Sequence, residues 1–297
     1  MGQKSIITTT DFFYPLVDDP YLMGQITCAN VLSDIYTMGI TNIDHILMLL
    51  GISTSMNEKE QEVSTTEIIK GFENKVKEAK TRITGGQTVY NPFPIIGGVG
   101  VAIVNSSDII YPGNAKVGDL LILTKPLGTR VVVNLMQWYK FEEEKWIKAM
   151  KYISEEDLEK AYELCCLMMS ELNYTAALLM QKYKARGATD ITGFGILGHA
   201  KNLAESQKDK VNLRIHTLPI IHMMNKLHDK IVDYKLLEGY CAETSGGLLV
   251  ISDPSQADNF VREFKTLRGH EAYIIGEIVK GEREAFIDSK PKIINVE

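Results

Sequence analysis

The sequence predicts an α+β protein of two domains, and three observations indicate this fold class. The chain has 297 residues, which exceeds one typical hydrophobic core and suits two domains of ordinary size. Strand-like and helix-like patterns are mixed in both halves. A turn-rich segment, YPGNAKVGD at residues 111–119, separates the halves. We therefore expect an N-terminal domain over residues 1–112 and a C-terminal α/β domain over residues 113–297.

The N-terminal half opens with a strand and a helix. Residues 6–17, IITTTDFFYPLV, are rich in the β-branched and aromatic types that favour strands. Asp19 and Pro20 then supply a capping and first-turn signal, and Gly39 ends the apolar pattern. This pattern predicts a helix over residues 20–38.

A buried strand, IDHILMLLGI at residues 43–52, precedes a charged helix over residues 57–80. Residues 82–104 then predict a strand, a glycine turn and another strand. Within them, TGGQT at residues 84–88 is alternatively a bulged hairpin, and GGVG at residues 97–100 a close strand crossing. Neither segment matches a Walker loop or a dinucleotide-binding fingerprint.

The C-terminal half begins with a strand, a turn and a helix over residues 119–139. Two more helices are expected between residues 155 and 184, followed by a glycine-rich stretch and its helix. The remainder alternates strand, helix and strand. Its expected strands are NLRIHTL, GGLLVI and EAYIIGEIV.

Composition excludes several classes of partner. The chain has 32 Lys and Arg against 38 Asp and Glu, a formal charge of −6, and no polybasic run, so nucleic acid is not expected as a main partner. No apolar run approaches the roughly 20 residues of a membrane span. The four cysteines show neither zinc-finger spacing nor a disulfide framework, and the opening MGQKSI lacks a signal peptide's apolar core. We expect a cytoplasmic protein with reduced thiols.

Three aspartates have neighbours that are unusual for surface acids. Asp11 lies inside a strand-like run, Asp34 lies in an apolar stretch of the first helix, and Asp190 opens a glycine-rich turn. Acids in such surroundings are either satisfied locally or bound to a ligand. Spacing leaves both interpretations open, because an edge-strand acid, a polar helix position and an N-cap would explain the three equally well.

The glycine-rich turn is ATDITGFGILGHA, residues 188–200. Its glycines allow close approach of the backbone, and a helix start presents free N–H groups that suit an anion. The carboxylate of Asp190 would repel a phosphate there unless a divalent cation lay between them. His199, at the end of the stretch, is either a structural helix residue or a catalytic one.

Six segments stand out, in the order TTTDFFYPLVDDP, ANVLSDIYTMG, TGGQT, LTKPLGT, ATDITGFGILGHA and ETSGGLL. Together they closely resemble the selenophosphate synthetase family, from about Ile7 to Ile287. The family belongs to a superfamily of ATP-using synthetases that includes aminoimidazole ribonucleotide synthetase and thiamine phosphate kinase. A thiamine phosphate kinase would show a DVSDGL-like stretch in place of TDITGFG, and the aminoimidazole enzyme a GGETAEMPG-like stretch in place of TGGQT.

The resemblance implies a fold and a reaction. The N-terminal α+β domain would pair its strands with those of a second subunit in a barrel, giving a homodimer, and a C-terminal α/β domain would pack against it. The reaction would convert ATP, selenide and water into selenophosphate, AMP and phosphate.

The resemblance also implies roles for particular residues. Asp11, Asp34 and Asp190 fall on the family's aspartates that hold Mg²⁺ and the ATP phosphates. The segment that contacts ATP, offered across the dimer, falls on Gly85, Gly86, Gln87 and Thr88. Mg²⁺ prefers oxygen ligands from a few carboxylates and substrate phosphates, which agrees with these residue types.

The beginning of the chain departs from the family pattern. In the family, a glycine-rich segment ahead of TTTDFF carries a catalytic Cys or selenocysteine, a nearby Lys and a further metal-binding Asp. These 297 residues have no counterpart, and MGQKS resembles an abbreviated start. We therefore expect a truncated, inactive core that contains no catalytic residue. The alternative is a non-catalytic dimeric or regulatory relative of the same fold.

Overall fold

The computed structural model describes residues 3–297, so Met1 and Gly2 of the expected abbreviated start lie outside the described residues. The chain forms two compact units. Unit 1 contains the residues up to Ile109 together with Ser170–Leu178, and unit 2 contains the remaining residues, Ile110–Met169 and Leu179–Glu297. Among the described residues, no helix is long and apolar enough to cross a membrane.

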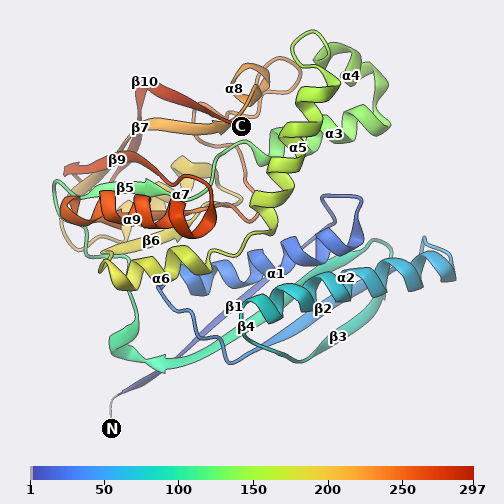
Figure 1. Cartoon of the computed structure of the whole chain (residues 1–297), viewed down its shortest axis with the longest axis horizontal. Helices are drawn as coiled ribbons and strands as arrows, with labels where there is room; N and C mark the ends of the chain where they lie inside the picture. Colours follow the sequence, from blue (N-terminus) through green and yellow to red (C-terminus); the bar gives the residue numbers. More distant parts are fainter. Residues whose placement is uncertain (1–2) are drawn as a thin grey trace. The chain divides into compact units, whose positions relative to one another are not determined.

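Unit 1 is a four-stranded sheet with two helices on one face (Figure 1). The strand order is β1-β4-β2-β3, in which β4 pairs antiparallel with β1 and β2, and β2 pairs parallel with β3. Its elements are β1 (Lys4–Phe13), α1 (Pro20–Thr37), β2 (His45–Ser53), α2 (Glu58–Glu78), β3 (Ile83–Asn91), β4 (Ile95–Asn105) and the 3₁₀ turn η1 (Ser106–Asp108).

The starts of both helices follow the local signals. The carboxylate of Asp19 accepts hydrogen bonds from the N–H groups of Tyr21 and Leu22, which confirms the helix predicted from residue 20. Asn57 caps α2 and forms a reciprocal capping box with Glu60. The first strand, predicted to reach residue 17, instead ends at Phe13. Pro15 lies just beyond this end and has no N–H group to donate to a strand pair.

The predicted glycine turn between the last two strands of this unit is wrong, because TGGQT lies inside β3. The chain turns at residues 92–94 instead, where two prolines interrupt strand pairing. The register between β2 and β3 skips Thr84, so the segment does contain a bulge. Gly86 has φ +145°, and a Cβ there would lie 1.8 Å from the carbonyl oxygen of Met48 on β2.

The glycines of GGVG bring the backbone of β4 close to its neighbours, which are paired strands of the same sheet and helix α1 rather than a crossing strand. A Cβ at Gly97 would lie 2.3 Å from the carbonyl oxygen of Asp11 on β1. On the helix-covered face, a Cβ at Gly100 would lie 3.0 Å from the Cδ1 atom of Ile35. The small residues therefore let α1 lie directly on β4.

The face of the sheet opposite the helices is apolar and exposed in the single chain. We call it the outer face. Strand alternation places Ile6, Phe12, Val89 and Ile103 on it, and each side chain is more than half exposed. A single chain therefore leaves a contiguous apolar surface open to water.

Residues 170–178 join unit 1 although they lie far from it in sequence. The amide of Asn173 donates a hydrogen bond of 3.0 Å to the hydroxyl of Ser33 on α1. The ring of Tyr174 packs edge-on against Tyr36, with 6.1 Å between centroids, and the ammonium group of Lys80 lies over the same ring. These contacts depend on tertiary packing, and no local sequence pattern indicates them.

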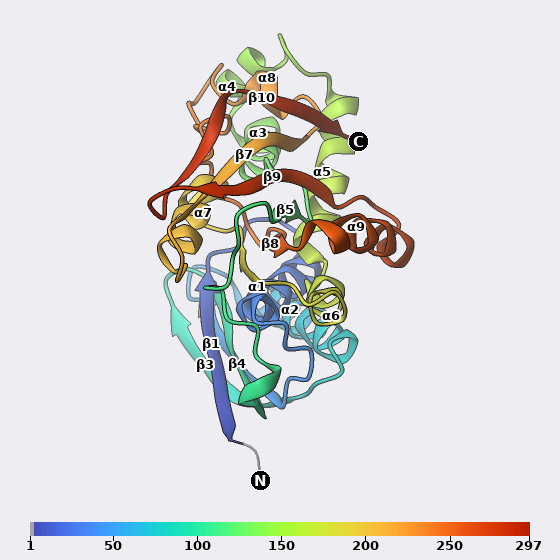
Figure 2. The same ribbon diagram turned by 90° about the vertical axis from the view of Figure 1, so that its left-hand side faces the viewer.

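Unit 2 is built on a six-stranded sheet of order β10-β7-β9-β5-β8-β6, with only the β10/β7 pair parallel. Helices α7 and α9 lie on opposite sides of it (Figure 2). Helices α4 and α8 and strands β6 and β10 were not predicted. The elements are β5 (Leu120–Leu123), α3 (Thr129–Phe141), α4 (Glu143–Ala149), α5 (Glu155–Ser170), α6 (Tyr174–Lys182, shared with unit 1), β6 (Gly187–Asp190), α7 (Gly195–Glu205), β7 (Val211–Ile221), α8 (Met224–Leu227), β8 (Leu248–Ser252), α9 (Pro254–Arg268), β9 (Tyr273–Lys280) and β10 (Ala285–Val296).

The two adjacent glycines of TGGQT differ in how well they would tolerate a side chain, because only Gly86 lies against the backbone of β2. We expect Gly86→Ala to lower the free energy of unfolding by about 2 kcal/mol or more, because the added methyl group meets the Met48 carbonyl in a strained backbone conformation. Gly85→Ala is the matched control, since its Cβ would make an ordinary 3.5 Å contact with the Leu47 side chain. Urea unfolding of both variants tests this, and equal midpoints would contradict it.

Candidate functional site

Asp11 and Asp34 lie together where β1 packs against α1. The hydroxyl of Thr9 donates a 2.7 Å hydrogen bond to Oδ2 of Asp34, and the amide of Asn30 donates a 3.1 Å bond to Oδ2 of Asp11. Thr9 and Asp11 lie on the same face of β1, and Asn30 and Asp34 lie one turn apart on α1. The strand and the helix thus each contribute one acid and one neutral donor.

This arrangement suits a hard cation. Asp11 is half-buried and Asp34 is exposed, so the pair is reachable from solvent. The hydrogen bonds from Thr9 and Asn30 orient one oxygen of each carboxylate without neutralising its charge. Carboxylate oxygens of this kind are the ligands that Mg²⁺ uses in proteins. The two donors were not identified from the sequence, although their spacing from the acids, two residues on a strand and four on a helix, is the signal that would have found them.

The predicted ATP-contact segment lies on the edge strand of the same unit. Gly85, Gly86, Gln87 and Thr88 are all exposed, and they pair with residues 47–50 of β2. Alternation places Gly85 and Gln87 on the outer face. The strand order leaves the second edge of β3 without a partner within the described chain.

Asp190 belongs to unit 2, where it ends β6 and is only 7% exposed. The turn that follows is organised by His199 on α7, whose Nε2 lies 3.1 Å from the Thr192 hydroxyl and accepts a 3.4 Å hydrogen bond from the N–H of Phe194. These contacts give His199 a structural role in the turn. A Cβ at Gly193 would meet nothing within 4 Å, so the backbone of the turn is open on that side.

Glu243 in the ETSGGLL motif is a buried carboxylate of unit 2 that was not among the predicted site residues. It accepts hydrogen bonds from the N–H groups of Gly128 and Thr129, at 2.7 and 2.8 Å, and from the Thr129 hydroxyl. These groups form the start of α3, where no side chain of the helix itself provides a cap. Burial raises the pKa of Glu243 to about 7, and the three hydrogen bonds oppose that rise.

A second buried polar group ties the same two motifs together. Lys125 of LTKPLGT is 1% exposed, and its ammonium group donates a 2.8 Å hydrogen bond to the carbonyl of Ser245. A Cβ at Gly247 would lie 2.4 Å from the backbone nitrogen of Lys125, so the two segments are in direct backbone contact. LTKPLGT and ETSGGLL therefore form one polar cluster inside unit 2.

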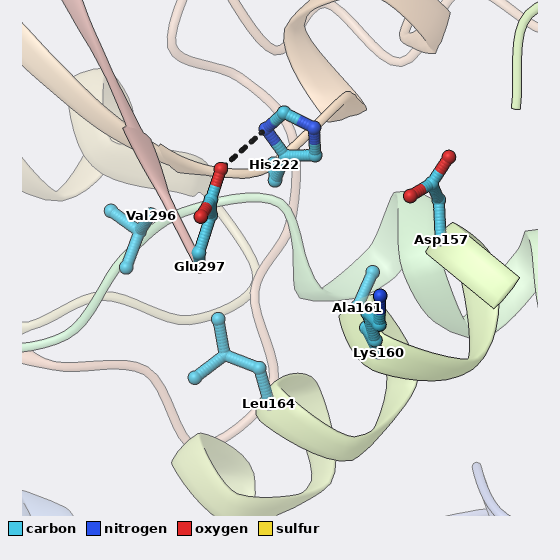
Figure 3. Close-up of a pocket in the computed structure, with 7 residues that line it drawn as sticks. All are labelled: Asp157, Lys160, Ala161, Leu164, His222, Val296 and Glu297. Atoms are coloured by element: carbon cyan, nitrogen blue, oxygen red, sulfur yellow. Dashed lines mark ion pairs between the residues drawn. The ribbon is translucent and has the colours of Figure 1, made fainter.

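A hollow of about 310 Å³ in unit 2 contains none of the predicted site residues (Figure 3). Within it, Nδ1 of His222 lies 3.7 Å from a carboxylate oxygen of Glu297. This hollow is therefore not the predicted site for ATP and magnesium. Its lining residues are Asp157, Lys160, Ala161, Leu164, His222, Val296 and Glu297.

Comparison with known proteins gives the family. Residues 1–104 match the N-terminal domain of AIR synthase related proteins, and residues 116–289 match the C-terminal domain. Over 99% of its own length, the chain is 51% identical to selenide, water dikinase 2 of Mus musculus. Over 98% of its own length, it is 46% identical to selenide, water dikinase of Dictyostelium discoideum. The chain belongs to the selenide, water dikinase family. It spans 66% of the mouse relative and 82% of the Dictyostelium relative.

Membership of the selenide, water dikinase family confirms the resemblance drawn from the six motifs. Solved structures agree on the fold. Thiamine-monophosphate kinase from Stenotrophomonas maltophilia K279a superposes with a TM-score of 0.72 at 18% identity, covering 97% of this chain and 86% of that one. The hydrogenase maturation protein HypE in complex with ATP superposes with a TM-score of 0.69 at 12% identity, covering 93% and 77%. The predicted α+β fold of the aminoimidazole ribonucleotide synthetase-like superfamily is therefore confirmed.

The pKa of Glu243 makes stability depend on pH. The folded protein keeps the Glu243 proton up to about pH 7, whereas the usual value for glutamate is 4.5. The folded state thus binds more protons between these values, and stability falls as pH rises through that window, by about 3 kcal/mol. We expect Glu243→Gln, which keeps one of the two acceptor oxygens and has no charge to bury, to flatten this dependence.

Urea unfolding between pH 5 and pH 8 measures the effect. Glu205→Gln, an exposed change on α7, is the control and should keep the wild-type slope. A Glu243→Gln variant that lost stability with rising pH as the wild type does would contradict the assignment.

Proposed function

We propose that this chain belongs to an enzyme that forms selenophosphate from ATP and selenide. In the balanced reaction, ATP, selenide and water give selenophosphate, AMP and phosphate, so one phosphoryl group passes to selenium and the other to water. The observation that carries the proposal is the pair of oriented carboxylates, Asp11 and Asp34, in a chain about half identical to selenide, water dikinases. Their position at the family's TTTDFF and ANVLSD motifs is the one expected for residues that handle ATP.

Magnesium fits the residues that would hold it. Each of Asp11, Asp34 and Asp190 is assigned as a magnesium ligand, since all three offer carboxylate oxygens and no softer donor. Mg²⁺ supplies charge neutralisation for the polyphosphate, which the acids alone would repel. Thr9 and Asn30 would keep the two unit 1 carboxylates oriented in the absence of the ion.

ATP is assigned as the substrate on two grounds. The first is the name of the relatives, which are dikinases. The second is HypE, a protein of the same fold that was solved in complex with ATP. Gly85, Gly86, Gln87 and Thr88 would contact the nucleotide, and their exposure on an edge strand leaves their backbone and side chains available for it.

A homodimer follows from the outer face of unit 1. Its exposed apolar side chains, Ile6, Phe12, Val89 and Ile103, form a surface that a second copy of the sheet would cover. Gly85 and Gln87 lie on the same face, so the contact between copies would carry the ATP-contact segment toward the partner chain.

We infer a cytoplasmic location. All four cysteines, Cys28, Cys165, Cys166 and Cys241, are buried, and none forms a disulfide bond. Cysteines without disulfide bonds are typical of a reducing compartment.

Nucleotide binding tests the magnesium site. We expect ATP to bind in the presence of Mg²⁺ and Asp34→Asn to weaken this binding at least tenfold, about 1.4 kcal/mol, because a ligand charge is lost where the phosphates need the cation. Glu73→Gln, the same loss of charge on the exposed face of α2, is the control. Isothermal titration calorimetry with and without Mg²⁺ makes the measurement, and equal affinities in the two buffers would sink the assignment.

Product analysis separates the proposed enzyme from a non-catalytic relative. Phosphorus NMR of the full-length protein with ATP, Mg²⁺ and selenide should show a selenophosphate resonance together with AMP and phosphate, whereas these 297 residues alone, in which no catalytic residue is expected, should give none above the no-enzyme control. A full-length protein that binds ATP·Mg²⁺ and forms dimers but yields no product would instead be the dimeric or regulatory relative.

Light scattering tests the dimer. We expect the wild-type chain to have the mass of two copies at micromolar concentration and Ile103→Asp, which places a charge on the outer face, to have the mass of one. Val63→Asp is a matched control, since Val63 on α2 is as exposed as Ile103, at 51%, but lies on the helical side. Monomeric wild-type protein, or an Ile103→Asp dimer, would contradict the proposed interface.

A further inference from the structure

The segment between α8 and β8 in unit 2 brings one imidazole and two carboxylates together. His228, Asp233 and Glu238 each offer a ligand atom, and these three atoms all lie within 4.8 Å of one another. We propose that they form a binding site for a divalent transition-metal ion of the Zn²⁺ class. The site lies outside the motifs assigned to ATP and Mg²⁺, and it does not depend on the proposed reaction.

Backbone hydrogen bonds hold the three residues near each other. The N–H of Tyr234 donates to the carbonyl of His228 at 2.8 Å, which closes a short loop and returns Asp233 to the side of the histidine. The N–H of Tyr240 donates to the carbonyl of Lys235 at 3.0 Å, and this second loop contains Glu238. The ligand residues thus sit on a backbone shaped without the ion, which lowers the entropy lost on binding.

The imidazole of His228 has a buried nitrogen that no protein group contacts by a hydrogen bond. His228 is 6% exposed, and its Nδ1 has no hydrogen-bond partner within the described part of the chain. A buried polar atom without a partner is costly, and buried histidines usually engage both ring nitrogens. A metal ion bound at Nδ1 would supply the interaction that the surrounding protein does not provide.

The carboxylates complete the donor set from the solvent side. Asp233 and Glu238 are exposed, so an ion can enter and a water molecule can take a further coordination position. Oδ1 of Asp233 accepts a 2.9 Å hydrogen bond from the N–H of Lys235, which orients this carboxylate. Ligand atoms of a tetrahedral Zn²⁺ site lie roughly 3.3 Å apart, so a modest movement of the two exposed side chains closes the site.

The mixed donor set distinguishes this ion from magnesium. One imidazole nitrogen with two carboxylate oxygens suits Zn²⁺, Co²⁺ or Mn²⁺, whereas Mg²⁺ prefers oxygen ligands and keeps much of its water. A bound ion would also fix the segment that leads directly into Glu243, whose carboxylate caps α3.

Calorimetric titration of the whole chain with Zn²⁺ alone, free of Mg²⁺ and nucleotide, tests the proposal. We expect one ion per chain with a micromolar or lower Kd, and at least tenfold weaker binding for Asp233→Asn and for Glu238→Gln. Both changes are exposed and conservative, so they leave the fold intact for comparison. Asp229→Asn is the matched control, an exposed acid in the same loop and outside the cluster, and it should bind like the wild type.

Two further measurements separate this site from the proposed magnesium site. Asp34→Asn should keep its Zn²⁺ affinity. Co²⁺ in place of Zn²⁺ should give the visible absorption of a low-coordinate site in the wild type and lose it in Asp233→Asn. Absence of Zn²⁺ binding, or wild-type affinity in both cluster variants, would overturn the proposal whatever the outcome at Asp34.

Discussion

The direct backbone contact between α1 and α2 is the constraint on which the candidate site of unit 1 depends. A Cβ at Gly24 would lie 2.1 Å from the carbonyl oxygen of Ile68, and a Cβ at Gly71 would lie 1.8 Å from that of Tyr21. The helices can approach this closely only because both positions lack side chains. This contact fixes the rotation of α1 about its axis, so Asn30 and Asp34 face β1. The geometry of the acids is therefore set by glycines that never touch them.

Local signals predicted the elements whose causes are local. The cap and proline at Asp19 placed the start of α1, and the six motifs placed the acids in a known family. Glycine predicted structure less well, because a glycine can mark either a turn or a close backbone contact. In TGGQT, Gly86 lies against the backbone of Met48 and does not form a turn. The partners of Glu243 lie more than 110 residues away, so no local pattern could reveal that this acid caps α3.

The acids of the chain illustrate two opposite uses of a carboxylate. Glu243 is buried and surrounded by donors, so its oxygens hold the ETSGGLL segment to the start of α3. Asp34 is exposed and oriented by a single neutral donor, so most of its lone pairs face outward. Burial together with the number of donors, rather than the type of residue, separates the acid that maintains structure from the acid that is free to bind a cation.

The burial of every cysteine has a practical consequence. Burial raises the pKa of Cys28, Cys165 and Cys241, and only the thiolate reacts with alkylating reagents. Each thiol therefore stays inert until the structure around it opens. Cys28 lies in unit 1 and the other three cysteines lie in unit 2. The alkylation rate of Cys28, followed by peptide mass spectrometry, would accordingly report how often unit 1 of the native protein opens, and the rates of the other three cysteines would report the opening of unit 2.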